Sequence, residues 1–160
     1  MSNMHNVTPG HVPQNDAGYL EMMTKVIFMG GLSRQVVEAK WEGFLDAFDR
    51  FDPASVANFT EEDVERLSED ERIIRYGAKI KAVVKNAREM LHIAEEHGSF
   101  GQWLRDQVQE EGIAATSQTL SDRFSYVSED SAKRYLYAVG EDIGEVPEKV
   151  QEKYGPHEGS

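Results

Sequence analysis

Apolar residues return every three or four positions along most of this chain, and this spacing constrains the fold more than any other feature. It is clearest in Tyr19, Leu20, Met23, Ile27 and Phe28. Val, Ile and Thr never alternate with polar residues over the length of a strand, and hairpin signals are missing. No repeat of solenoid length is visible. The sequence therefore predicts an all-α fold.

Capping and helix-breaking residues divide the pattern into separate helices. Gly30-Gly31 should end the first helix, and Ser33 should cap the second. Pro53 is expected at a helix start, and Thr60 should cap the acidic segment after it. Further helices are predicted over 76–97, ended by Gly98, and over 100–111, 128–139 and 145–153. The predicted buried stripe of the second helix is Val36, Val37, Trp41, Phe44, Leu45 and Phe48.

A chain of 160 residues is long enough for one domain with its own core. Residues 1–16 lack apolar periodicity and contain Pro9, Gly10 and Pro13, so we predict a flexible N-terminal arm there. Residues 17–153 are expected to form the helical domain, and residues 154–160 a frayed tail.

Composition excludes several kinds of site. There is no Cys, which rules out disulfides, thiolate zinc sites and a Cys nucleophile. His92 and His97 are five residues apart, on different helix faces, so we expect no metal and no cofactor. The most apolar run, around residues 26–32, is far shorter than the roughly 20 residues a membrane helix needs. A cytoplasmic protein is the expectation.

The formal net charge of −12 argues against unspecific nucleic-acid binding, because DNA affinity depends on phosphate neutralisation. One window opposes this charge: "RIIRYGAKIKAVVKNAR", residues 72–88, has six basic residues and no acid. Its expected buried stripe is Ile80, Val83, Val84, Ala87 and Leu91. Two interpretations stay open, a solvated face that balances an acidic protein and a ridge that contacts phosphates. The DNA-backbone candidates for the ridge are Arg72, Arg75, Lys79 and Asn86.

Several segments match one family in order and nearly without gaps. They are "GLS" at 31–33, "FDPASVANFTEEDVERL" at 51–67, "IIRYGAKI" at 73–80, "NAR" at 86–88 and "HGSFGQWL" at 97–104. Over residues 20–104 the chain thus resembles the 3-methyladenine DNA glycosylase I family, a helix-hairpin-helix group of base-excision repair enzymes. The resemblance implies a single helical domain and DNA N-glycosylase chemistry.

The departures from the family are equally specific. Its zinc-binding Cys and His residues and its tyrosine-rich substrate loop have no counterpart here, so we expect the fold without the zinc site. Its E-G-F-Q-A-G-L-S-W segment is represented by "VIFMGGLSR", which puts Val26 in place of the base-recognising acid and Arg34 in place of the stacking tryptophan. The base-pocket candidates are Tyr19, Val26, Phe28 and Arg34.

The family's hairpin, similar to F-V-G-P-T followed by a helix, reads "YVSEDSAKRYLYAVG" here. Ser128 replaces the first glycine, and Glu129 and Asp130 place carboxylates beside it. These residues suit a helix N-terminus, with Ser128 as the cap and two acids at the positive end of the dipole. They suit a phosphate clamp poorly, because the carboxylates compete for the same amides.

No other acid clearly replaces the lost one. The face formed by Glu38, Glu42 and Asp46 is typical of a solvated stripe. Asp142, Glu145 and Glu148 follow the hairpin, roughly where the broader superfamily carries its catalytic Asp. Lys133 fits a surface lysine better than a Schiff-base nucleophile. The catalytic residues are therefore unknown.

Three functions remain open. The first is a glycosylase-like module without base excision, which binds duplex DNA weakly and salt-dependently or binds a protein partner. The second is an active DNA N-glycosylase with an altered base pocket. The third is an acidic helical protein-interaction module with no nucleic-acid role. Whether the chain is an enzyme stays open with them.

Overall fold

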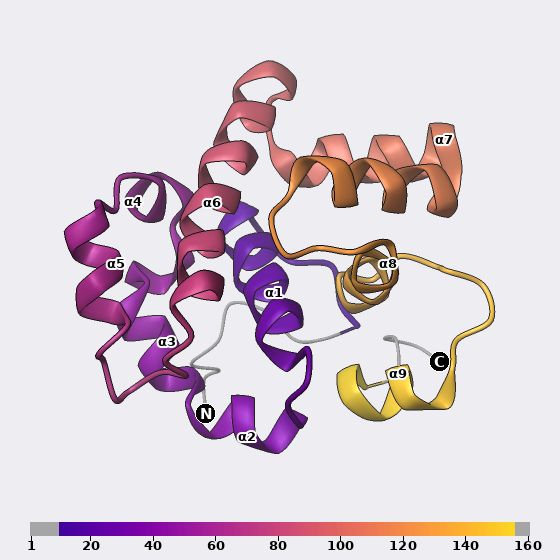
Figure 1. Ribbon diagram of the computed structural model, residues 1–160. Coiled ribbons are helices and arrows are strands. Elements are labelled where there is room, and N and C mark those ends of the chain that lie inside the picture. Colours follow the sequence, from indigo (N-terminus) through magenta and orange to yellow (C-terminus); the bar gives the residue numbers. More distant parts are fainter. Residues whose placement is uncertain (1–9, 156–160) are drawn as a thin grey trace.

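Helix α1 (Asp16–Met29) is the central element, and residues 18–29 are all buried. A helix that is buried on every side must be covered by neighbours in all directions. The computed structural model describes residues 10–155, and Figure 1 shows the other helices around α1. α2–α6 lie on one side of it, and α8 and α9 lie on the other.

The first side holds short helices and one long one. They are α2 (Arg34–Ala39), α3 (Trp41–Ala47), the single-turn η1 (Asp49–Phe51), α4 (Pro53–Ala57), α5 (Glu61–Leu67) and α6 (Gly77–His97). The predicted boundaries are confirmed at Ser33, which accepts from the Val36 amide, and at Pro53. Thr60 forms a capping box with Asp63 at the start of α5. Gly98, at φ 92°, ends α6 as expected.

An aromatic stack fills the space between α1, α3 and α4. Trp41 stacks on Phe44 with ring centroids 4.7 Å apart and on Phe51 at 5.5 Å. Phe48 continues the stack toward Phe51 and Phe59. All five rings are buried, and two of them, Phe51 and Phe59, come from the "FDPASVANF" segment.

The second side consists of α7 (Phe100–Arg123), α8 (Glu129–Ala138) and α9 (Glu148–Tyr154). Gly112, at φ 89° and ψ 172°, divides α7 into two arms that run out and back in Figure 1. The first arm confirms the helix predicted over 100–111. The second arm, residues 113–123, was missed because its sequence carries only a weak apolar stripe.

Two details of the predicted stripes are wrong. Val36 is 47% exposed, because the helix expected from Ser33 breaks at Lys40 into α2 and α3. The break rotates the second segment, so Val37 alone faces the core from α2. In α6, Leu91 is half-buried, whereas Met90 and Ile93 take the core positions.

The ends of the domain also differ from the expected boundaries. Gly10 and Pro13 are buried, and the Gly10 amide donates to the Ala138 carbonyl at 2.7 Å, so the last part of the expected arm packs on α8. Tyr154, assigned to the tail, is 1% exposed and belongs to the core. Residues 1–9 of the arm and 156–160 of the tail lie outside the described residues.

Residues 10–155 contain no strand, in agreement with the predicted all-α class. No described helix is long and apolar enough to cross a membrane. Within the same residues, no three His, Asp or Glu side chains come together in a way that could hold a metal ion.

Candidate functional site

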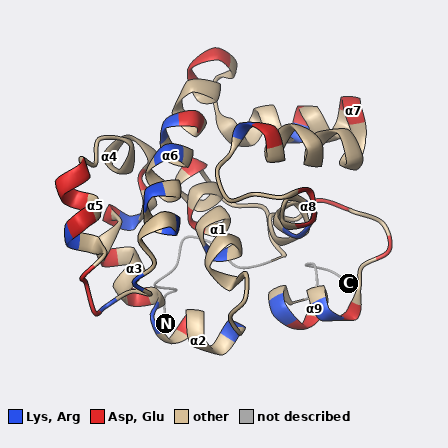
Figure 2. Cartoon of the chain, in the orientation of Figure 1, with Lys and Arg blue, Asp and Glu red and all other residues tan. Residues whose placement is uncertain are grey.

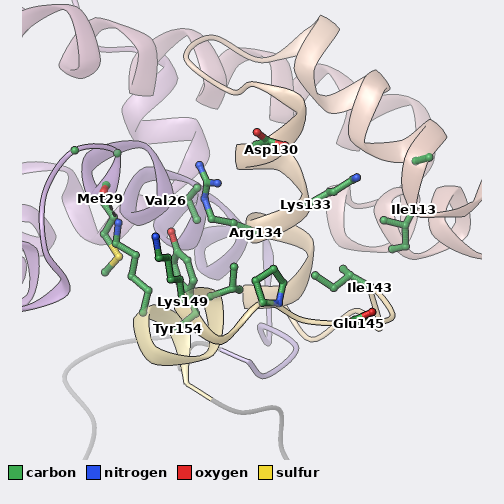
Figure 3. Close-up of a pocket in the computed structure, with 16 residues that line it drawn as sticks. Val26, Met29, Ile113, Asp130, Lys133, Arg134, Ile143, Glu145, Lys149 and Tyr154 are labelled. Carbon is green, nitrogen blue, oxygen red and sulfur yellow. Dashed lines mark hydrogen bonds between the residues drawn. The ribbon is translucent and has the colours of Figure 1, made fainter.

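A cavity of about 850 Å³ lies between α1, α7, α8 and α9 (Figure 3). We call it the α8–α9 cavity. Its apolar wall comprises Val26, Met29, Ile113, Ala114, Ile143, Pro147, Val150 and the ring of Tyr154. Its charged lining comprises Asp130, Lys133, Arg134, Glu145, Lys149 and Lys153. A volume of this size is typical of a pocket for a small molecule.

Two lysines cap the C-terminal end of α1 at the edge of this cavity. The Lys153 ammonium donates to the Met29 carbonyl at 2.8 Å, and the Lys79 ammonium donates to the Gly30 carbonyl at 3.1 Å. Cations are favoured at the negative end of a helix dipole. Burial lowers the pKa of both lysines, and the nearby Arg134 charge lowers that of Lys153 further.

Arg134 and Tyr154 form the polar floor of the cavity. Figure 3 shows Arg134 reaching from α8 toward Val26. Burial raises the pKa of Tyr154 to about 12, although the charge of Arg134 and its hydrogen bond to the phenol oppose this rise. Arg134 also donates to the Ser131 hydroxyl at 3.2 Å. The guanidinium is therefore fixed in orientation by two neighbours.

The lining is rich in cations. All four Lys and Arg residues that follow Arg123 in the sequence line the cavity, whereas only Asp130 and Glu145 do so among the described acids of that stretch. None of the four cations forms an ion pair with a carboxylate within residues 10–155. The cavity thus has a positive balance inside a chain of net charge −12.

The four predicted base-pocket residues do not converge. Val26 lines the α8–α9 cavity and is 4% exposed. Phe28 points to the other side of α1, where its ring meets Phe44 at 4.8 Å. Tyr19 lies two turns away, packed on Phe100 and hydrogen-bonded to Arg105. Arg34 is exposed at the start of α2, outside the cavity lining.

The predicted DNA-backbone residues do not form a free ridge either. Lys79 is only 9% exposed because it caps α1, and Asn86 is buried. The Asn86 amide bonds both the amide and the carbonyl of Ser125, at 2.7 and 3.1 Å, and so ties the hairpin loop to α6. Arg72 pairs with Asp70 at 2.7 Å. Arg75 is exposed and is the one member of the set that could meet a phosphate without first breaking a bond.

The remaining cations of the 72–88 window face α5. Lys81, Lys85 and Arg88 line a hollow of about 290 Å³ together with Glu61 and Glu65. Arg88 donates to the carbonyls of Ala57 and Phe59. Figure 2 shows this basic stretch of α6 beside the strongly acidic α5. Carboxylates therefore oppose much of its field.

The hairpin has the predicted capping chemistry. The Ser128 hydroxyl accepts from the Ser131 amide at 3.1 Å, and Glu129 and Asp130 occupy the first turn of α8. Tyr126, at φ 61°, takes the left-handed conformation that the loop requires.

Two of the acids considered as replacements for the lost one lie in different places. Glu145 lines the cavity. Glu38 pairs with the buried Lys25 at 2.6 Å, on the far side of α1.

Sequence reasoning missed Arg134, Lys149, Lys153 and Tyr154. A signal was present, because the basic residues after Arg123 are few and recur at 133, 134, 149 and 153. Tyr154 was not recognised because it was assigned to the tail. Only the docking of α9 beside α8 brings these residues together.

The sequence model of the family described as methyladenine glycosylase matches residues 1–136. DNA-3-methyladenine glycosylase 1 of Escherichia coli is 37% identical over 112 residues, which are 69% of this chain and 60% of that protein. A DNA-3-methyladenine glycosylase of Haemophilus influenzae is 34% identical over 74 residues, 46% of this chain and 40% of that protein. The chain thus spans less than two thirds of the length of these relatives.

Solved structures give the same fold. A crystal structure of 3-methyladenine DNA glycosylase I superposes with a TM-score of 0.74 at 27% identity and covers 83% of each chain. A solution structure of 3-methyladenine DNA glycosylase I gives a TM-score of 0.70 at 29% identity, over 82% of this chain and 81% of that one. The fold predicted from the resemblance is confirmed, and this chain belongs to the methyladenine glycosylase family.

Proposed function

We propose that this chain is a DNA-binding member of the methyladenine glycosylase family that does not excise bases. The observation that carries the proposal is Val26. It lines the cavity, it stands in the position of the acid of the family's E-G-F-Q-A-G-L-S-W segment, and its side chain offers no hydrogen bond. An extruded base needs hydrogen bonds to its polar edge and a face on which to stack.

The surroundings of Val26 do not replace what is lost. Arg34 occupies the tryptophan position but is exposed and away from the cavity, so no aromatic from α2 can stack on a base there. Arg134 and Lys153 put positive charge around Val26. A cationic methylated purine would be repelled by these groups, whose field is stronger in a partly desolvated cavity than in water.

DNA remains the best-supported partner. The Escherichia coli and Haemophilus influenzae relatives are named for action on 3-methyladenine in DNA, and this chain has their helical scaffold. The expected affinity is low, because net charge is −12 and only Arg75 of the predicted ridge is exposed and unpaired. Each phosphate neutralised should add about 0.9 to the slope of log affinity against log salt.

Base release from alkylated duplex DNA tests the missing chemistry. We expect no free 3-methyladenine above the background of heat-inactivated protein, with the Escherichia coli relative as the positive control. Release of 3-methyladenine by the native protein, but not by the heat-inactivated protein, would contradict the proposal.

Duplex binding at low and moderate salt tests the partner. We expect weak binding that falls with salt and is reduced by Arg75→Glu. Lys85→Glu is the matched control, since it makes the same charge change in the hollow beside Glu61 and Glu65. Absence of binding at low salt would instead favour the acidic interaction module. Equal effects of both variants would show that binding depends on net charge and not on Arg75.

A second function is favoured by one specific observation. Glu145 and Asp130 both line the cavity, so a carboxylate outside α1 could act on a base in an active glycosylase with an altered pocket. In that case the native protein releases a base, and Glu145→Gln or Asp130→Asn abolishes the release without changing the unfolding temperature.

A further inference from the structure

We infer that the α8–α9 cavity binds a phosphate monoester carried on a nucleoside. The inference deepens the proposed function and rests on it, because it assigns a ligand to the cavity in which α1 presents Val26 and not an acid. Four cations and two carboxylates line this cavity. Acids that lie farther from the cavity than the Debye length, about 8 Å at physiological salt, are largely screened.

The cations stand in two groups with different roles. Arg134 and Lys153 are half-buried and already oriented, Arg134 by Ser131 and Tyr154 and Lys153 by the Met29 carbonyl. An ammonium has three protons and a guanidinium five, so both keep donors free for an anion. Arginine forks match phosphate oxygens in geometry, and such charge-assisted bonds are stronger than neutral ones.

Lys133 and Lys149 form the second group. Both are exposed, and neither makes an ion pair or hydrogen bond with another described residue. Figure 3 shows Lys133 pointing toward Ile113, with Glu145 beside Ile143. These lysines add positive potential at the mouth without any structural bond that a ligand would have to break.

The apolar wall indicates what the phosphate is attached to. Val26, Ile143 and Val150 supply a surface that can cover a flat base, and Tyr154 adds a buried hydroxyl at the floor. A bare inorganic anion would leave this wall uncovered. A base without a phosphate would leave the cations unneutralised. A nucleotide satisfies both parts of the lining.

The ligand chemistry can come from two sources, a free mononucleotide or the phosphorylated end of a DNA strand. Calorimetric titration of the full chain with AMP, adenosine and inorganic phosphate tests the shared chemistry. We expect AMP to bind at least about tenfold more tightly than adenosine and than inorganic phosphate. Equal binding of AMP and adenosine, or no binding of AMP at millimolar concentration, would overturn the inference.

Charge-reversal variants locate the site. Lys133→Glu with Lys149→Glu should weaken AMP binding by about tenfold or more, because both lysines face the cavity. A pair of reversals outside it, Lys81→Glu with Lys85→Glu, makes the same change in net charge and should leave AMP binding within about twofold. Arg134→Met is a third variant, to be compared only where circular dichroism shows a native fold. Equal losses in the two double variants would show that the effect is only net charge, and the inference would fail.

Two further measurements distinguish the two sources of the ligand, and distinguish this inference from the proposed function. If the ligand is a strand end, a duplex with phosphorylated ends should bind more tightly than one with hydroxyl ends. If the ligand is a free nucleotide that AMP mimics, the two duplexes should bind alike. Base release from alkylated DNA is measured separately. Release would contradict the non-excising function without bearing on the preference for AMP over adenosine, and loss of that preference would leave the non-excising function standing.

Discussion

The two sides of α1 place charged side chains in opposite settings. On the side of α2 and α3, the Trp41 indole donates to Glu21 at 2.8 Å, and Lys25 pairs with Glu38 and lies over the Trp41 ring. On the side of α8 and α9, cations line a cavity and have no carboxylate partner within the described residues. Paired charges on the first side hold the core together. Unpaired charges on the second side remain free for a ligand.

The largest expected effect is on the first side. Trp41→Ala removes a fully buried ring from the aromatic stack and leaves Glu21 without its indole donor. We expect a loss of about 4 kcal/mol in the free energy of unfolding, measured by urea denaturation. Val36→Ala, at an exposed position of α2, is the control and should change stability by less than about 0.5 kcal/mol. Similar losses in both would remove the contrast between the paired core and the rest of the molecule.

The second effect belongs to Tyr154, on the cavity side. Its pKa is raised from 10.0 to about 12, so the folded state holds the phenol proton more tightly than the unfolded state. The stabilising contribution is present below pH 10 and is lost as the pH rises from 10 to 12, in total about 2 to 3 kcal/mol. Urea denaturation across this pH range should show a shallower decline for Tyr154→Phe than for the native protein. Parallel declines would mean that the phenol is accessible to water.

A smaller effect is expected at the end of α1. Lys79→Met removes the bond to the Gly30 carbonyl and the ammonium 5.1 Å from the Tyr76 ring centroid. We expect a loss of about 1 to 2 kcal/mol, by the same denaturation measurement. Lys85→Met, on the exposed face of α6, should be nearly neutral. If both variants are neutral, Lys79 does not stabilise α1, and its place in the predicted DNA ridge would have to be reconsidered.

The smallest effect is expected at Lys149, and it tests most directly whether the two sides of α1 differ. Lys149→Glu should change the free energy of unfolding by less than about 0.5 kcal/mol, because this lysine is exposed and unpaired. Thermal unfolding would measure it. A large loss would mean that Lys149 is a structural group like Lys25, and the cavity side would no longer differ from the core side.

Much of the fold followed from local sequence. Ser33, Pro53 and Thr60 begin helices where their capping chemistry requires, and Gly30 and Gly98 end them. The site did not follow in the same way. The motif put Val26 among the base-pocket candidates. Phe28 points to another side of α1, since neighbours along a helix point in different directions, and Arg34 lies on the next helix, α2.

The residues of the predicted DNA ridge do not form one exposed surface, for a related reason. A helical wheel places Lys79 and Asn86 on one shoulder, but it cannot show that the Gly30 carbonyl and the Ser125 loop come to meet them there. Long polar side chains at such positions can reach a partner that only the folded chain supplies. The sequence gives no distance between residues 30 and 79 or between 86 and 125.

Alone, the sequence determined the all-α class, most helix boundaries and the family. These depend on periodicity, caps and motifs, which are local. Only the tertiary structure decided that α9 docks beside α8, that Tyr154 is buried and that four cations from residues 133–153 share one cavity. That arrangement depends on contacts between segments distant in the chain, whose free energy comes from burying surfaces that no local pattern pairs.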